Sequence, residues 1–61
     1  MQTSKQISAN QRRTMRAMIS KIEKMAGDFA DVDNWMLEKC EEFKADAERY
    51  LSELEENLAG E

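Results

Sequence analysis

The second half of the chain repeats apolar residues in steps of four and three. The repeat runs through Met36, Cys40, Phe43, Ala47, Tyr50 and Leu54. Steps of four and three place side chains along one side of an α-helix, and such a seam is typical of helices packed on other helices. The pattern predicts a helix over about 33–59, beginning at Asp31 or Asp33, with Gly60 beyond its end.

A second apolar stripe predicts an earlier helix over about 4–26. The stripe contains Met15, Met18, Ile19, Ile22, Met25 and Ala26, with Ile7 as an outlying member. This helix could begin at Ser4, or at Ser8, because Ser8 followed three residues later by Gln11 matches a capping box. The first half of the chain is therefore predicted to be helical over most of its length.

Gly27 is the strongest break in the helical pattern, and the residues after it are typical of helix ends and caps: Asp28, Asp31, Asp33 and Asn34. We therefore expect a turn over about 27–32, with Phe29 and Val32 covering the closed end. The predicted fold is all-α: one domain, residues 1–61, in which two antiparallel helices form a hairpin.

A chain this short has a marginal core, because a domain of about 60 residues buries only about 60% of its unfolded surface. Disulfides, a structural metal or self-association usually compensate. One cysteine and no histidine argue against the first two. We therefore expect two hairpins to dimerise into a four-helix bundle. The predicted core and dimer seam contains Met15, Met18, Ile22, Met25, Met36, Cys40, Phe43, Ala47, Tyr50, Leu51, Leu54 and Leu58.

In outline, this architecture resembles the short dimeric hairpins, a group that includes the plasmid-encoded RNA-binding protein Rop. The likeness lies in the outline alone and is carried by no residue motif. A reading frame of 61 residues with its own start methionine is also typical of the small accessory genes of phages and plasmids.

The sequence contains no recognisable catalytic, metal-binding or phosphate-binding motif. Cys40 falls on the apolar seam, and the chain lacks histidine, the commonest base beside a nucleophilic thiol. We expect a non-enzymatic protein with no cofactor and no metal. The longest run of large apolar residues, 35–37, is far shorter than the about 18 needed for a membrane span. The N-terminus does not resemble a signal peptide, so a cytoplasmic location is expected.

Charge is distributed unevenly along this acidic chain, whose net charge is −4. Residues 1–27 contain six basic residues and one acidic residue, and residues 28–61 contain three basic and twelve acidic residues. The favoured interpretation is attraction between a basic helix and an acidic helix lying side by side. Two alternatives stay open. Arg12, Arg13 and Arg16 could contact nucleic acid, and a ridge of Glu41, Glu48 and Glu55 could contact a basic protein surface.

Trp35 is the one tryptophan, and helical spacing places it off the seam. It either folds back over the closed end or stays exposed as an anchor for a protein partner. The methionines could likewise fill the core or line an adaptable groove for a foreign helix.

The leading hypothesis is an accessory or regulatory protein that binds another protein as a homodimeric bundle. One alternative is a dimer that binds nucleic acid. The second alternative is a structural subunit that completes the helical bundle of a partner.

Overall fold

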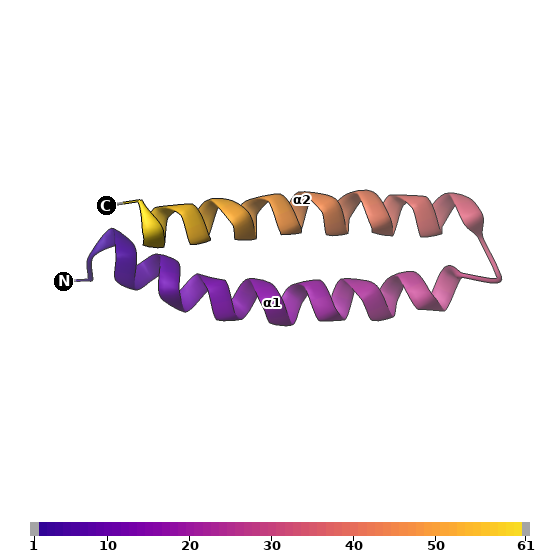
Figure 1. The fold of residues 1–61 in the computed structure, drawn as a ribbon. Coiled ribbons are helices and arrows are strands. Elements are labelled where there is room, and N and C mark those ends of the chain that lie inside the picture. Colours follow the sequence, from indigo (N-terminus) through magenta and orange to yellow (C-terminus); the bar gives the residue numbers. More distant parts are fainter. Residues whose placement is uncertain (1, 61) are drawn as a thin grey trace.

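Two α-helices of equal length lie side by side and antiparallel, with both chain termini at the same end (Figure 1). The structure is a computed structural model that describes residues 2–60. Helix α1 spans Ser4–Phe29 and helix α2 spans Asn34–Ala59, each with 26 residues. The hairpin is a narrow rod with extents of 46 × 16 × 14 Å. The predicted all-helical architecture with two packed helices is confirmed.

Helix α1 begins with a capping box formed by Thr3 and Gln6. The Gln6 N–H donates to Thr3 Oγ1 at 3.1 Å, and the Thr3 N–H donates to Gln6 Oε1 at 2.9 Å. These two bonds satisfy backbone donors that have no partner inside the helix. The alternative capping box of Ser8 and Gln11 is wrong, because Ser8 is buried within the helix.

Helix α1 does not end near Gly27 but continues to Phe29, so the connection occupies residues 30–33 instead of about 27–32. Glycine ends a helix most readily in the left-handed conformation, and Gly27 does not have a positive φ. The boundary is set further on, where Asp33 Oδ1 accepts a hydrogen bond from the Met36 N–H at 3.1 Å and caps α2. Phe29 is half-buried, but Val32 is 81% exposed and does not cover the closed end as predicted.

Replacing Gly27 with alanine should stabilise the protein by about 0.5–1 kcal/mol, because glycine inside a helix costs about that much relative to alanine. A Cβ atom at Gly27 would meet nothing within 4 Å. The midpoint of thermal unfolding, followed by circular dichroism, should rise by several degrees. Gly60→Ala is the control, because its Cβ would lie 2.7 Å from the Glu56 carbonyl oxygen and should bring no gain. An unchanged midpoint for Gly27→Ala would contradict a helical Gly27.

The buried core between the helices is thin. Its centre is formed by Ile19 and Ile22 of α1 and Ala47 of α2, with Met15 and Leu51 packed against them. No described side chain is less than 2% exposed. A core this small contributes limited hydrophobic stabilisation, because that term scales with the apolar area removed from water.

The side of α2 that faces α1 differs from the predicted seam. The buried and half-buried positions that follow steps of three and four are Leu37, Cys40, Lys44, Ala47, Leu51, Leu54 and Leu58. Cys40, Ala47 and Leu54 belong to both patterns. Phe43 and Tyr50 of the predicted seam lie beside this interface and are exposed, and Met36 is half-buried.

Candidate protein-interaction surface

Large apolar side chains remain exposed along one side of the hairpin. We call this surface the apolar face, and it consists of Ile7, Met18, Met25, Phe43 and Tyr50. Met18 and Met25 are seven residues apart, as are Phe43 and Tyr50, so each pair lies on one side of its helix. The Tyr50 hydroxyl donates to Gln11 Oε1, and Gln11 lies seven residues before Met18. This hydrogen bond therefore joins the two helices on the apolar side.

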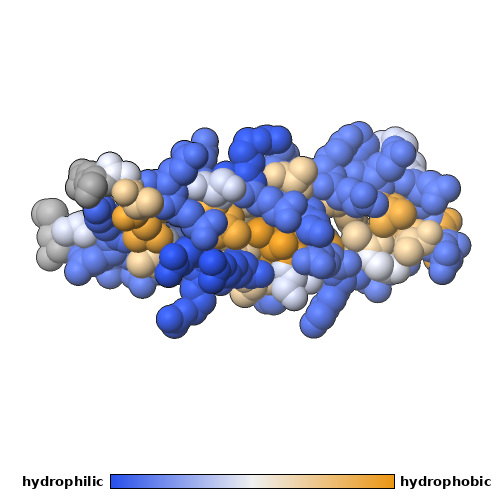
Figure 2. Space-filling model, in the orientation of Figure 1, coloured by the Kyte–Doolittle hydropathy of each residue, from blue (hydrophilic) through white to orange (hydrophobic). Residues whose placement is uncertain are grey.

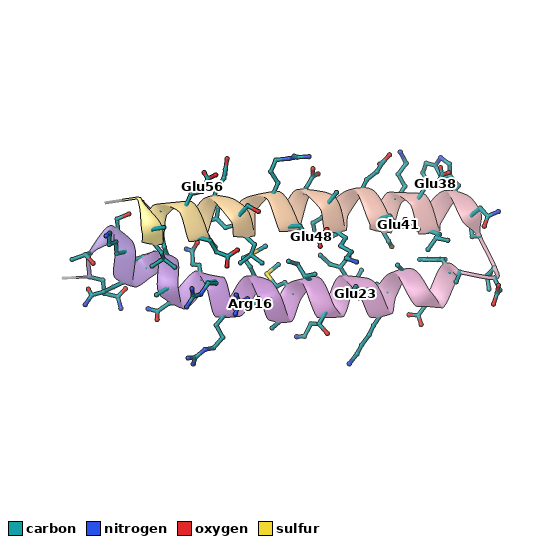
Figure 3. The ribbon with its side chains drawn as sticks, viewed as in Figure 1. Arg16, Glu23, Glu38, Glu41, Glu48 and Glu56 are labelled. Carbon is teal, nitrogen blue, oxygen red and sulfur yellow. The ribbon has the colours of Figure 1, made fainter. Side chains whose placement is uncertain are left out.

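Ion pairs between the helices lie elsewhere on the hairpin. Arg16 Nη2 lies 3.3 Å from Glu55 Oε2, and Lys44 Nζ lies 3.9 Å from Glu23 Oε2. These side chains are a third or more exposed, so each pair contributes at most about 1 kcal/mol. Together with Glu48 these four residues form what we call the charged face, and Figure 3 shows Arg16, Glu23 and Glu48 along it.

The apolar face and the charged face lie on opposite sides of the buried core. Residues five apart on a helix are separated by about 140° around its axis. Met18 and Glu23 are five apart, and so are Phe43 and Glu48. On each helix, the residues of the apolar face and those of the charged face therefore lie on opposite sides of the buried residues. In the view of Figure 2, hydrophilic residues cover most of both helices and hydrophobic residues form a band between them.

The predicted seam residues separate into two groups in the structure. Those buried or half-buried in the single hairpin are Met15, Ile22, Met36, Cys40, Ala47, Leu51, Leu54 and Leu58. Those on the apolar face are Met18, Met25, Phe43 and Tyr50. The hairpin thus covers eight of the twelve predicted seam residues at least in part within one chain and leaves the other four exposed.

The closed end of the hairpin carries an exposed aromatic ring. Trp35 lies in the first turn of α2 and is 62% exposed, so it does not fold back over the turn. The Lys39 ammonium group lies 5.1 Å from the ring centroid, which is within the range of a cation–π contact. With Val32 nearby in the chain, this end of the hairpin presents exposed apolar surface.

The three arginines that could contact nucleic acid are not equivalent. Arg12 is half-buried beside α2, and Arg16 pairs with Glu55. Arg13 is exposed. Burial of one arginine and pairing of another reduce the positive charge that a phosphate backbone would meet.

The predicted acidic ridge lies mostly on the charged face. Glu41 and Glu48 line an open groove that also contains Lys44. Glu55, the third member of the ridge, is engaged by Arg16. Basic residues thus neutralise part of the ridge within the hairpin itself.

A partly buried polar contact joins the two helices at the open end of the hairpin. Asn57 Nδ2 donates to Ser8 Oγ at 2.6 Å and to Ser4 Oγ at 2.9 Å. Ser8 is the one buried polar residue of the described chain, and its hydroxyl is satisfied by this bond. A specific polar contact between two helices favours one register between them. The pattern of apolar residues does not reveal this contact.

Residues 2–60 contain no cluster of histidine, cysteine or carboxylate side chains arranged to hold a metal ion. Within the same range, neither helix has the length and apolar character required to cross a membrane. No protein-family model, curated protein or solved structure matches the chain.

Proposed function

We propose that this protein is a non-enzymatic binding protein that acts as a homodimer, in which two hairpins join through their apolar faces to form a four-helix bundle. The observation that carries the proposal is the apolar face itself, which lies opposite a charged face on a chain with a thin core. A larger protein would then bind to the outer surface of the dimer, at the Trp35 end or along the acidic side of α2. Such a protein fits an accessory or regulatory role.

The side of the hairpin that bears the apolar face is large enough to accommodate a second copy. A standard protein interface buries about 800 Å² on each partner, and the broad side of this rod, 46 Å by 16 Å, has a projected area of roughly 700 Å². Because side chains make the surface uneven, its solvent-accessible area is larger than its projected area. Two copies also double a core that is thin within one chain, and self-association is one of the usual means of stabilising small proteins.

Nucleic-acid binding is the less favoured alternative. It would use Arg12, Arg13 and Arg16, of which Arg12 is half-buried and Arg16 is held by Glu55. The net charge of −4 further weakens attraction to phosphate. The arginines therefore support the proposal less well than the apolar face does.

Sedimentation equilibrium of the purified chain over a range of concentrations tests the proposal. We expect a monomer–dimer equilibrium at micromolar concentration, with far-ultraviolet circular dichroism typical of a helical protein. The midpoint of thermal unfolding should rise with protein concentration, because association stabilises the folded state by mass action. A helical monomer at every concentration would contradict self-association. A weakly helical monomer would instead favour the structural-subunit alternative, in which another protein covers the apolar face.

A further inference from the structure

Two hairpins that meet through their apolar faces can be related in two ways. In the first arrangement, both turns lie at the same end, and α1 of each copy packs on α2 of the other copy. In the second arrangement, the turns lie at opposite ends, so that α1 packs on α1 and α2 packs on α2. Neighbouring helices are antiparallel in both arrangements. Helix direction therefore does not distinguish them.

The charges of the two helices do distinguish them. Helix α1 contains six basic and two acidic residues, and α2 contains three basic and eight acidic residues. The same-end arrangement places each basic helix on an acidic helix of the other copy. The opposite-end arrangement places like-charged helices together, which is unfavourable at an interface.

Charged residues at the edges of the apolar face show the same complementarity. Lys21 lies between Met18 and Met25 in the chain, and Asp46 lies between Phe43 and Tyr50, so both border the apolar face. The contact between Glu23 and Lys44 shows that residues near 21 in α1 are level with residues near 46 in α2.

In the same-end arrangement, the α2 of the second copy lies level with the first copy's own α2, so Lys21 would meet Asp46 of the second copy. Among residues 2–60, Lys21 has no ion-pair partner within the hairpin. Asp46 is paired with Arg49 of its own helix at 2.9 Å, and both side chains are exposed. The charge of Lys21 is therefore available to a second copy.

We propose that the dimer adopts the same-end arrangement, with each α1 packed on α2 of the other copy. This inference rests on the proposed homodimer and specifies its geometry. The two turns lie side by side, which brings two Trp35 rings and two Val32 side chains to one end of the bundle. A partner of the dimer would meet a doubled apolar surface at that end.

Electron–electron dipolar spectroscopy on a spin label at the turn tests this arrangement. The label is attached at D31C, an exposed position, in a C40A background so that each chain has one thiol. Neighbouring helices lie about 10 Å apart. Two labels at the same end should therefore be separated by roughly 30 Å or less, including their linkers. Labels at opposite ends should be separated by about the 46 Å length of the hairpin.

A mixed sample provides the matched control. One population carries the label at D31C and the other carries it at A59C, which lies at the open end of the hairpin. The same-end arrangement predicts a new long distance in the mixed sample, and the opposite-end arrangement predicts a new short one. Circular dichroism of each labelled chain establishes that the labels leave the helices intact.

The outcomes separate this inference from the proposed function. A short distance between labels at D31C supports the same-end arrangement. A distance near the full length of the hairpin overturns that arrangement but leaves the homodimer standing. Loss of all dipolar modulation between chains would mean that no dimer forms, and it would overturn the arrangement together with the proposed function.

Charge exchange tests the arrangement by a second route. Lys21→Glu should weaken dimerisation, and combining it with Asp46→Lys should restore it, because the pair is reversed across the same-end interface. If the double variant dimerises more weakly than Lys21→Glu alone, the arrangement is contradicted.

Discussion

Phe43→Glu is expected to convert the proposed dimer into monomers at concentrations where the unchanged chain is dimeric. Phe43 belongs to the apolar face and is 51% exposed in the single hairpin. Completing the burial of a phenylalanine contributes about 1–1.5 kcal/mol, and the dimer contains two copies of it. A buried, unpaired carboxylate adds a further penalty. The dissociation constant should therefore rise by about two orders of magnitude or more.

Ala45→Glu is the matched control for Phe43→Glu, because it adds the same charge at an exposed position of α2 away from the apolar face. This variant should sediment as the unchanged protein does. If Phe43→Glu lowers helicity by weakening association, a higher protein concentration should recover part of it by mass action. A Phe43→Glu chain that remains fully dimeric would contradict the role of the apolar face.

Ile22→Ala is expected to cause the second large effect, a loss of about 2–5 kcal/mol in the free energy of unfolding. Ile22 is the most buried hydrophobic residue of the described chain, at 3% exposure, and its truncation leaves a cavity beside Ile19 and Ala47. A chain of this length typically has a total stability of roughly 3–9 kcal/mol. The midpoint of thermal unfolding should fall by about 10 °C or more.

Ile22→Val is the control for the cavity, because it removes one methylene group and should cost about 0.5–1.5 kcal/mol. Thermal unfolding followed by circular dichroism gives both values. Equal midpoints for Ile22→Ala and the unchanged chain would show that Ile22 does not lie in the core.

The hairpin was predictable from the sequence, but the division of the seam was not. Two heptad patterns overlap on α2 and share Cys40, Ala47 and Leu54. One continues through leucines that face α1, and the other continues through Phe43 and Tyr50. Both patterns predict packing against a helix, and periodicity does not distinguish a helix of the same chain from a helix of another. The structure assigns the leucines to the hairpin and leaves the aromatic residues exposed.

The helix boundaries illustrate a second limit of sequence patterns. Gly27 was expected to end α1, but glycine is compatible with a helix interior at a cost of about 1 kcal/mol. The cap at Asp33 fixes where α2 begins, and α1 extends to meet the turn. Two capping boxes were available at the start of α1, and the one formed by Thr3 and Gln6 adds a further turn of helix before Ser8. Local motifs thus predict which types of residue cap the helices, but they predict less well where along the chain those caps lie.

The candidate site was harder to predict from the sequence, because it depends on which side chains the folded hairpin leaves exposed. Sequence spacing places Trp35 off the seam but leaves open whether it folds back, and in the structure it is exposed in the first turn of α2. The pairing of Arg16 with Glu55 joins residues 39 apart in the chain, which local patterns do not specify. The same is true of the contact between Ser8 and Asn57.

The most direct test of the central claim is the solvent accessibility of the methionine methyl groups in the assembled protein. Relaxation of these methyl signals by a neutral, soluble paramagnetic agent reports how closely solvent approaches each one. In a single hairpin, Met18 and Met25 are exposed and Met15 is half-buried. If a second copy covers the apolar face, Met18 and Met25 should relax no faster than Met15. Faster relaxation of both, at concentrations where sedimentation detects the dimer, would contradict the account.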